Sequence, residues 1–189
     1  MLERKYISLI DFGAGNLHSV YKAFKFIGAD IEITKDPKVI EKSSAVVFPG
    51  VGAFGSVMNA IRKNNLEEII IKSAKSTKPF LGICVGMQVL FESGEENPDI
   101  KGLGVFKGRV IKFKKAKKIP HIGWNGLFYF VHSYYVFPED KTIIAAETEY
   151  DGETFTSIIK KDNLLAVQFH PEKSGEAGLE LLENFLKNC

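Results

Sequence analysis

The first half of the chain alternates short apolar runs with segments of helical periodicity. Four runs rich in β-branched and aromatic residues, each bounded by turn residues, predict buried strands at 6–10, 31–34, 45–48 and 80–83. Between them, residues 16–27, 54–63 and 66–76 carry apolar side chains at helical spacing. Strands that alternate with helices predict a parallel sheet covered by helices on both faces.

The second half has a different pattern, in which glycines punctuate short strands. The predicted strands are 104–106, 109–113, 127–131, 143–146, 155–159 and 164–169. Antiparallel pairing is expected among them, and an amphipathic helix is predicted over 176–187. No linker or internal repeat divides the sequence. We therefore predict a single α/β domain over residues 1–189, with a central mixed, largely parallel sheet flanked by helices.

Composition and charge are those of a globular protein and exclude several classes. The 189 residues are 45% hydrophobic and 25% charged, which supplies a core and argues against disorder. A net charge of +2 gives no global sign of a nucleic-acid or membrane partner. The longest N-terminal apolar run, 6–10, is too short for a signal peptide or a membrane span.

The lysine-rich stretch 109–118 is expected to be a solvated strand edge, with a docking surface as the alternative.

The chain has only two cysteines, Cys84 and Cys189. Two cysteines cannot form a dense disulfide framework or a four-ligand zinc site, so a reducing, cytoplasmic location is the simpler interpretation. No recognised metal-ligand spacing is visible, and neither a metal nor a cofactor is expected. Cys189 is interpreted as incidental.

Cys84 stands in the pattern Gly82-Ile83-Cys84-Val85-Gly86, between an apolar strand and a helix-compatible stretch at 87–91. This is the arrangement of a nucleophile elbow, with cysteine in place of serine. The glycines permit close backbone packing around a strained residue, and free amides at the start of a helix favour a thiolate. A buried core cysteine is the alternative interpretation.

A base and an orienting acid follow a later strand, in the pattern Gln168-Phe169-His170-Pro171-Glu172. Proline favours an extended path, along which side chains two residues apart point to the same side, so Glu172 is expected to orient His170. Cysteine, histidine and an acid form the set used for acyl transfer. The other histidines, His18, His121 and His132, are less convincing bases.

Two glycine-containing segments complete the candidate chemistry. Pro49-Gly50-Val51-Gly52 follows a predicted strand directly, and its backbone N–H groups could face a developing oxyanion; a plain tight turn is the alternative. Asp11-Phe12-Gly13-Ala14-Gly15-Asn16 is similar to the start of a dinucleotide-binding pattern, but His18 stands at the third glycine position. A tight turn into a helix explains this segment without a nucleotide.

Together these motifs resemble the class I triad glutamine amidotransferases, whose fold is α/β and flavodoxin-like. The matching stretches are Gly82-Ile83-Cys84-Val85-Gly86-Met87-Gln88, Pro49-Gly50-Val51-Gly52 and Gln168-Phe169-His170-Pro171-Glu172-Lys173-Ser174. More narrowly, three further stretches are similar to the glutaminase subunit of imidazole glycerol phosphate synthase: Gly13-Ala14-Gly15-Asn16, His121-Ile122-Gly123-Trp124-Asn125 and Tyr129-Phe130-Val131-His132-Ser133-Tyr134. The resemblance runs over almost the whole chain.

The resemblance implies a role for each matching residue. Cys84 attacks the carboxamide of glutamine, His170 moves the proton, and Glu172 orients His170. A glutamyl thioester forms, and water resolves it to glutamate after ammonia has left. The residues implied to shape the oxyanion site are Gly50, Val51, Gly52 and Val85. Those implied to hold the glutamine head group are Gln88, Glu96 and the backbone of His132, Ser133 and Tyr134.

The resemblance also implies a partner. In the family, ammonia passes into a (β/α)8-barrel cyclase subunit of a heterodimer. There it reacts with a phosphorylated ribulosyl intermediate, which yields imidazole glycerol phosphate and an aminoimidazole carboxamide ribotide in histidine biosynthesis. Trp124, Lys173 and Asn16 correspond to the subunit junction, with a core position as the alternative for the tryptophan. Family members hydrolyse glutamine poorly alone, which predicts an imperfect oxyanion geometry around Val51.

One stretch departs from the family. Members carry a longer connection between the Gly-Trp-Asn and Tyr-Phe-Val-His motifs, whereas residues 126–128 alone separate Asn125 from Tyr129 here. Three residues are expected to be too few for a strand end, a turn and a new antiparallel strand. We therefore expect either a lost hairpin or, in preference, a chain break that the numbering closes over, with a Cα–Cα distance well above roughly 3.8 Å.

Three other functions fit parts of the pattern. A paralogous glutaminase would feed a surface-sugar amidation enzyme, and the sequence does not separate it from the histidine role because the partner binds the distinguishing substrate. A free-standing cysteine hydrolase would be active alone and would not use Trp124. A catalytically silent interaction module is disfavoured by the intact Cys84, His170 and Glu172.

Overall fold

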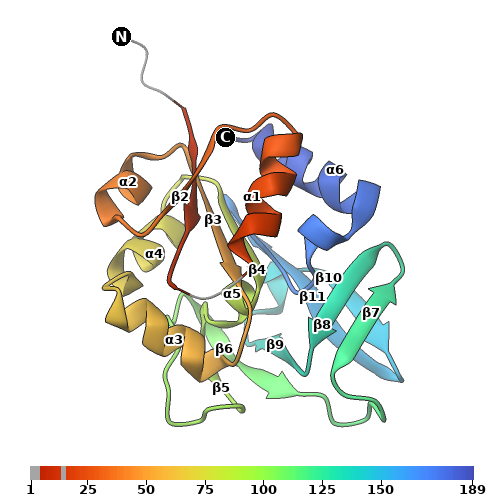
Figure 1. The fold of residues 1–189 in the computed structure, drawn as a ribbon. Helices are drawn as coiled ribbons and strands as arrows, with labels where there is room; N and C mark the ends of the chain where they lie inside the picture. The colour runs from red at the N-terminus through yellow and green to blue at the C-terminus, as the bar shows by residue number, and fades with distance from the viewer. Residues whose placement is uncertain (1–4, 14–15) are drawn as a thin grey trace.

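The computed structural model describes residues 5–13 and 16–189 and is built around a seven-stranded sheet (Figure 1). The strand order is β10-β11-β12-β4-β3-β1-β2. Its parallel part comprises β1 (Ile7–Ile10), β2 (Ile31–Thr34), β3 (Ala45–Gly50), β4 (Phe80–Cys84) and β12 (Leu164–Val167). β11 (Glu153–Lys161) and β10 (Ile144–Tyr150) extend it in antiparallel pairing, with the 3-10 turn η1 (Lys141–Ile143) before β10. The predicted mixed, largely parallel sheet is confirmed.

Helices cover both faces of this sheet (Figure 1). α1 (Leu17–Phe26) and α6 (Gly175–Leu186) lie side by side, with the rings of Phe24 and Phe185 in edge contact at 6.2 Å between centroids. α2 (Pro37–Lys42), α3 (Phe54–Lys63) and α4 (Glu67–Ala74) lie on the other face. The four helices predicted from periodicity are confirmed to within two residues at each end.

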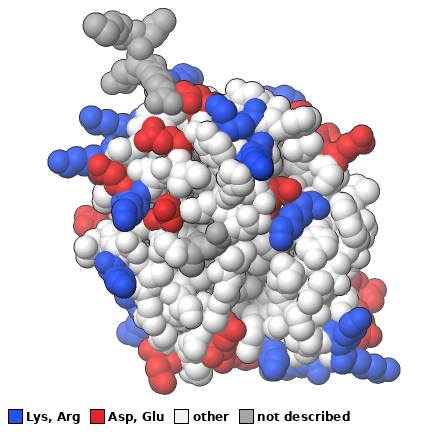
Figure 2. Space-filling model, viewed as in Figure 1, with Lys and Arg blue, Asp and Glu red and all other residues white. Residues whose placement is uncertain are grey.

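Charged side chains gather mostly along the rim of the face seen in Figure 1, and its lower central area holds few of them (Figure 2). Beneath the surface a single hydrophobic cluster connects all the elements of the central sheet, with fully buried side chains such as Leu9, Phe48 and Phe80. Within the described ranges, no helix combines the length and the apolar character needed to cross a membrane.

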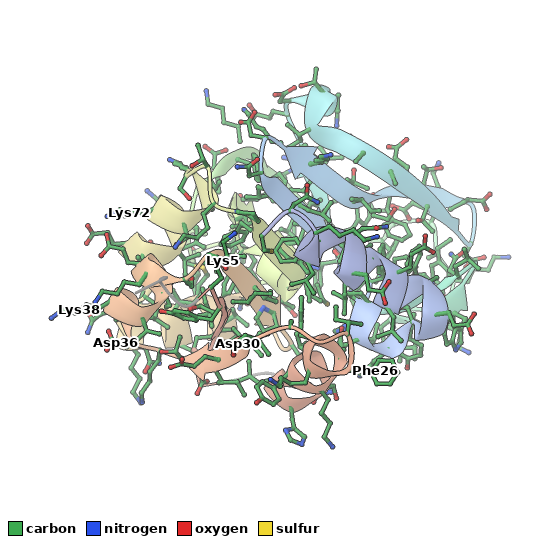
Figure 3. All side chains as sticks on the ribbon, turned by 90° about the horizontal axis from the view of Figure 1, so that it is seen from above. Lys5, Phe26, Asp30, Asp36, Lys38 and Lys72 are labelled. Atoms are coloured by element: carbon green, nitrogen blue, oxygen red, sulfur yellow. The ribbon has the colours of Figure 1, made fainter. Side chains whose placement is uncertain are left out.

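The short helix α2 has no counterpart among the predicted elements, because six residues are too few to show a helical period. It begins at Pro37, and Asp36 Oδ1 accepts a hydrogen bond from the N–H of Lys38 at 2.8 Å. In the view from above, Asp36 and Lys38 project from the outside of the molecule, as does Phe26 at the end of α1 (Figure 3). Lys5 and Asp30 mark the amino-terminal edge of the sheet in the same view.

Two smaller sheets follow the elbow. One contains β5 (Phe91–Gly94), β6 (Phe106–Lys112) and β9 (Tyr134–Pro138), and the other pairs β7 (His121–Asn125) with β8 (Phe128–His132). The helix expected over 87–91 is wrong, because α5 is a single turn, Val85–Gln88, and Phe91 already begins β5. Val89 and Leu90 are fully buried, and a short apolar run does not reveal whether it is helix or strand.

The connection between β7 and β8 shows that the preferred expectation of a chain break is wrong, whereas a connection shorter than in the family fits the structure. Asn125 pairs with Phe128, so Gly126 and Leu127 alone make the turn. Gly126 adopts φ +59°, the left-handed conformation that a two-residue hairpin turn requires. Three residues were expected to be too few, but Asn125 ends β7 and Phe128 already begins β8, so the turn itself needs only two residues.

The lysine-rich stretch is not the strand edge that was predicted. Arg109 and Lys112 are exposed on β6, which is the central strand of its sheet. Lys114 and Lys115 begin the loop that follows, and their backbone N–H groups donate to Glu153 Oε2 at 2.8 and 2.7 Å. Burial raises the pKa of Glu153, but these amides and the Tyr135 hydroxyl outweigh it, so that pKa is lowered. The loop is therefore fastened to β11 by a charged side chain.

Candidate active site

Cys84 occupies a strained turn where β4 meets α5. Its backbone has φ 53° and ψ −113°, and only 3% of the residue is exposed. The surrounding backbone packs tightly, because a Cβ on Gly86 would lie 2.1 Å from the Phe48 carbonyl oxygen and one on Gly50 would lie 2.6 Å from Gly86 N. Gly50 is the register partner of Cys84 in the pairing of β3 and β4. The predicted strand, sharp turn and helix are therefore present at Cys84.

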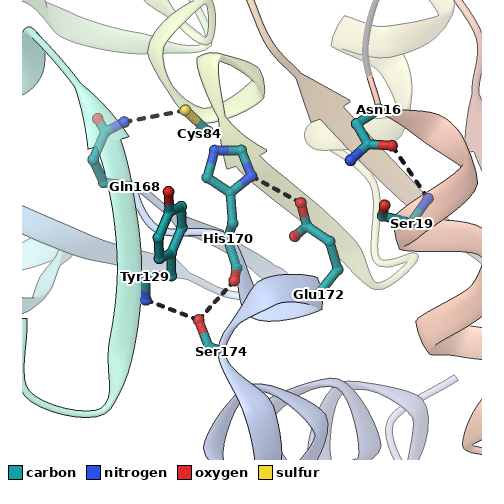
Figure 4. Close-up of polar contacts among 8 residues, drawn as sticks. All are labelled: Asn16, Ser19, Cys84, Tyr129, Gln168, His170, Glu172 and Ser174. Atoms are coloured by element: carbon teal, nitrogen blue, oxygen red, sulfur yellow. Dashed lines mark hydrogen bonds and ion pairs between the residues drawn. The ribbon is translucent and has the colours of Figure 1, made fainter. Parts of the chain in front are cut away.

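His170 and Glu172 form a buried pair beside this turn. Their Nδ1 and Oε1 atoms lie 2.8 Å apart, with 2% of each side chain exposed. Burial lowers the pKa of His170, but interaction with Cys84 and Glu172 outweighs it and raises that pKa to about 10. Nε2 of His170 is buried without a hydrogen-bond partner, and the ring lies between Cys84 and Glu172 (Figure 4).

The path of the chain between these two residues differs from the prediction. An extended path was expected, but residues Pro171–Lys173 form a 3-10 turn, η2, and this turn brings the Glu172 carboxylate to the imidazole. The predicted pairing is present for a different reason: proline suits the first position of a helical turn as well as an extended one. Ser174 holds the turn, since its hydroxyl donates to the His170 carbonyl at 2.6 Å and accepts from Tyr129 N at 3.0 Å (Figure 4).

A pocket of about 260 Å³ opens beside Cys84 and His170. Predicted residues that line it are Val51, Gly52, Val85, Gln88, Glu96, His132, Ser133 and Tyr134. Gly50 and Glu172 lie outside the lining, behind Cys84 and His170 respectively. Pro120 and Val131 also line the pocket and were not predicted, because they are apolar and carry no chemical signal. A larger groove of about 670 Å³ between α6 and β12 contains none of these residues.

One wall of the pocket is held by hydrogen bonds to the carbonyl of Tyr134. Gln88 Nε2 donates to this oxygen at 2.9 Å, and His132 Nδ1 lies at the same distance from it. On another side, Glu96 Oε2 accepts from the N–H of Phe54 at 2.7 Å, which places this carboxylate at the start of α3. Its second oxygen can serve a ligand.

His121 and His132 form a neutral pair beneath this wall. The carbonyl of Tyr134 can only accept, so His132 carries its proton on Nδ1 and accepts at Nε2 from Nδ1 of His121, 3.3 Å away. Burial lowers the pKa of His121 to about 4. The pKa of His132 is lowered to about 3, and burial is the largest cause. Both ring nitrogens of His132 are therefore engaged, whereas Nε2 of His170 is not, which favours His170 as the base.

The segment predicted to shape an oxyanion site follows β3. That strand continues through Pro49 and Gly50, so a plain Pro-Gly turn is not what the structure contains. Gly52 adopts φ +114°, and 36% of Val51 is exposed. Val51, Gly52 and Val85 all face the pocket, as an oxyanion site beside Cys84 requires.

The three residues predicted at a subunit junction lie at the carboxyl edge of the sheet. Trp124 is 61% exposed on β7, so the alternative of a core tryptophan is wrong. Its ring lies 6.3 Å from that of Tyr129, and Lys173 Nζ lies 5.8 Å from the same Tyr129 ring. Asn16 caps α1 by accepting from Ser19 N at 3.4 Å (Figure 4). Ala14 and Gly15 of the neighbouring motif lie outside the described residues.

Comparison with known sequences supplies the decisive observation. The profile of the family described as "Glutamine amidotransferase class-I" matches residues 8–189. The chain belongs to the class I glutamine amidotransferases. Within the part of this amidotransferase that the structure describes, no cluster of three or more His, Cys, Asp or Glu residues is arranged to hold a metal ion.

Relatives with the name "Imidazole glycerol phosphate synthase subunit HisH" are similar to this amidotransferase over nearly their whole lengths. The protein of Methanothermobacter thermautotrophicus is 46% identical over 197 residues, covering 96% of this chain and 98% of its own. That of Aquifex aeolicus is 45% identical, with 96% of both chains covered, and that of Pyrococcus furiosus is 47% identical, with 95% and 97% covered. The 197 aligned positions exceed the 189 residues of this chain, so the relative contains residues that are absent here.

Solved structures share the fold of this amidotransferase. A glutamine amidotransferase crystal structure has a TM-score of 0.67 at 20% identity, with 96% of this chain and 97% of the other covered. The structure of PurLQS from Thermotoga maritima has a TM-score of 0.69 at 16% identity, with 97% and 99% covered. The predicted class I amidotransferase-like architecture is confirmed.

One polar residue in the centre of the site was not predicted. Gln168 is completely buried, its Nε2 donates to Cys84 Sγ at 3.6 Å, and its Oε1 accepts from Gln88 Nε2 at 3.1 Å. A signal for it exists in the sequence. Gln168 stands two residues before His170 at the end of a strand, and such residues share a face.

Proposed function

We propose that this chain is the glutaminase subunit of imidazole glycerol phosphate synthase and supplies ammonia to that reaction in histidine biosynthesis, in the cytoplasm. The observation that carries the proposal is the 46% identity to a HisH subunit over 98% of the length of that subunit. Identity of this extent covers the pocket and its surroundings as well as the fold.

In the proposed reaction Cys84 is the nucleophile. Its sulfur attacks the carboxamide carbon of glutamine, and the carbonyl oxygen becomes an oxyanion. N–H groups of the segment Gly50, Val51 and Gly52 and of Val85 stabilise that charge, because donors aimed at a developing charge act strongly in a site without water. The pocket is lined by Val51, Gly52 and Val85, which supports this assignment.

His170 moves the protons in both halves of the reaction. With Nδ1 engaged by Glu172, only Nε2 is free to act, and it is the nitrogen on the side of Cys84. The raised pKa of about 10 keeps the ring protonated at neutral pH, ready to protonate the departing nitrogen. Collapse of the intermediate then breaks the C–N bond and leaves a glutamyl thioester and ammonia. The now neutral His170 takes a proton from water, whose oxygen attacks the thioester, and glutamate leaves as the Cys84 thiolate is restored.

The α-amino and α-carboxylate groups of glutamine require partners of both charges. We assign Gln88 and Glu96 to the substrate, with the carboxylate of Glu96 pairing the ammonium group. The backbone of His132, Ser133 and Tyr134 forms one wall of the pocket and offers peptide N–H and C=O groups. All five residues face one pocket of about 260 Å³, which suits one small amino acid.

The acceptor of the ammonia is a (β/α)8-barrel cyclase subunit. Trp124, Lys173 and Asn16 are assigned to the junction with it. An exposed tryptophan is a strong interface anchor, and 61% of this one is exposed. Its position near Tyr129, whose backbone oxygen accepts from His170 N at 2.9 Å, would connect the junction to the active site through β8.

The experiment that tests the proposal is an assay of glutamate release from glutamine. The chain is assayed alone, then with a histidine-pathway cyclase subunit, then with that subunit and its ribulosyl ligand. We expect slow release by the chain alone and a large increase only when both are present. Cys84→Ala is the catalytic control and should abolish release in every setting while it still binds the cyclase.

Each other outcome points to a named alternative. Equal activity with and without the cyclase would favour a free-standing cysteine hydrolase. Activity that only a sugar-amidating synthase increases would favour the paralogous glutaminase. Full activity of Cys84→Ala would overturn the catalytic assignment itself.

A further inference from the structure

Gln168 lies at the centre of a chain of hydrogen bonds that begins at the sulfur of Cys84. The sulfur of Cys84 accepts from Gln168 Nε2 (Figure 4), and Gln168 Oε1 accepts from Gln88 Nε2. Gln88 Nε2 also donates to the carbonyl of Tyr134. Every one of these contacts joins segments at least 46 residues apart in sequence.

The direction of this chain follows from the carbonyl at its end. Because the Tyr134 oxygen can only accept, Gln88 must present its amide nitrogen to it, at 2.9 Å. The second hydrogen on that nitrogen then points to Gln168, which must present its oxygen, at 3.1 Å. This leaves the amide nitrogen of Gln168, a donor, facing the sulfur of Cys84 at 3.6 Å.

The Tyr134 carbonyl is itself held in place. His132 Nδ1 lies 2.9 Å from it, and His121 Nδ1 lies 3.3 Å from Nε2 of His132. Both imidazoles are buried, with 2% of His121 and 6% of His132 exposed, so this end of the chain has little freedom to turn. The amide orientations of Gln88 and Gln168 are therefore set by a rigid acceptor.

A donor aimed at sulfur has an electrostatic consequence. A thiolate accepts a hydrogen bond from an N–H group much more strongly than a thiol does, so the donor favours the charged form. Burial disfavours a charge on the sulfur, because only 3% of Cys84 is exposed and a buried charge needs partners. His170 supplies the counter-charge, and the amide supplies the hydrogen bond.

We infer that Gln168 is a positioning residue that stabilises the Cys84 thiolate and holds its sulfur toward the pocket. This rests on the proposed function, in which Cys84 is the nucleophile, but it concerns a residue with no contact to the pocket itself. Gln168 is absent from the pocket lining, whereas Gln88, to which it is bonded, is part of it.

The test is the pH profile of Cys84 alkylation by iodoacetamide, measured in a Cys189→Ser background so that one thiol is titrated. Gln168→Leu removes the donor at similar volume. Gln168→Glu keeps the shape but presents an oxygen to the sulfur. For Gln168→Leu we expect the profile midpoint to rise by about one pH unit and kcat for glutamate release to fall about tenfold, with KM within about threefold. Gln168→Glu should move the midpoint further.

Ser157→Ala is the matched control. Ser157 is 2% exposed on the neighbouring strand, and its carbonyl accepts from Gln168 N at 2.9 Å, but its side chain is outside the hydrogen-bond chain to Cys84. It should leave the alkylation midpoint and kcat unchanged. Gln168→Met, which also lacks a donor, replaces Gln168→Leu if circular dichroism shows that the leucine variant is unfolded.

The outcomes separate this inference from the proposed function. Alkylation needs neither glutamine nor the cyclase, so a wild-type chain that releases no glutamate can still be titrated. A folded Gln168→Leu or Gln168→Met variant with an unchanged midpoint overturns the inference even if the wild type is an active glutaminase. A raised midpoint without any glutaminase activity in the wild type supports the inference on Cys84 and defeats the proposed function.

Discussion

The carboxylate of Glu172 lies 2.8 Å from the imidazole of His170, with both side chains 98% shielded from solvent. The 3-10 turn that joins them fixes which nitrogen of the ring is engaged, because Glu172 meets Nδ1 and leaves Nε2 without a partner. An amide in place of the carboxylate would keep the volume but remove the charge that supports a protonated ring.

Glu172→Gln is therefore expected to lower kcat for glutamate release by about 10²- to 10⁴-fold, since that is the usual contribution of a positioned acid–base pair. It should also lower the pKa of His170, because the carboxylate is one of the groups that raise it. The measurement is the pH dependence of kcat with the cyclase bound. Glu176→Gln, an exposed acid in the first turn of α6, is the matched control and should have wild-type activity.

Gly86→Ala tests the close approach of β3 to the elbow. The new Cβ would lie 2.1 Å from the Phe48 carbonyl oxygen, which is backbone and cannot turn aside. We expect a loss of at least about 2 kcal/mol in the free energy of unfolding, toward the upper end for an overpacked core, together with loss of glutamate release. Urea denaturation and the glutaminase assay measure the two effects.

Gly126→Ala is the control for this steric argument. Gly126 has φ +59° but open space around its Cβ position, so alanine there meets strain without a clash. Its cost should be about 1 kcal/mol, and its catalytic effect small. Equal stability losses in the two variants would show that no clash exists at Gly86.

Acidification is expected to destabilise the protein through the buried histidine pair. The pKa of His121 is lowered to about 4 and that of His132 to about 3, whereas an unfolded histidine titrates near about 6.5. Between these values the unfolded chain binds more protons than the folded one, so the stability contribution is complete above about pH 6.5 and is lost as the pH falls toward 4.

Urea unfolding at pH 7, 6 and 5 measures this effect, and His121→Gln isolates it. Glutamine can still donate to His132 but cannot take up a proton. Between pH 5 and 7 the slope of the unfolding free energy against pH should therefore decrease by an amount that corresponds to about one bound proton. An identical slope in the variant and the wild type would mean that His121 titrates normally in the folded protein.

Trp124→Ala tests the junction. We expect the dissociation constant of the complex with the cyclase to rise at least about tenfold, as for a central interface anchor, and glutamate release by the chain alone to stay unchanged. Phe26→Ala is the matched control, because Phe26 is 78% exposed at the end of α1 and is absent from the pocket lining. Equal effects of the two substitutions on the dissociation constant, measured by titration calorimetry, would remove Trp124 from the interface.

Local sequence patterns were sufficient to predict the first half of the fold and the three residues proposed for catalysis. Alternating apolar runs and helical periods are local, so β1 to β4 and the longer helices could be predicted from short windows. Cys84, His170 and Glu172 stand in short motifs whose turns and strand ends have characteristic residues. The resemblance to the amidotransferase family covers almost the whole chain, and the family profile matches residues 8–189.

Contacts between distant segments were needed to define three strands of the second half and the interior of the site. β5 and β7 were not predicted because polar residues and glycine interrupt their apolar runs, and pairing with distant strands determines their state. The aromatic run of β9 carried a strand signal that was missed. Strand alternation relates Gln168 to His170, but its contacts to Cys84 and Gln88, 84 and 80 residues away, come only from the fold. Side chains brought together by the whole fold acquire partners, and those partners decide which polar groups are charged and which way they face.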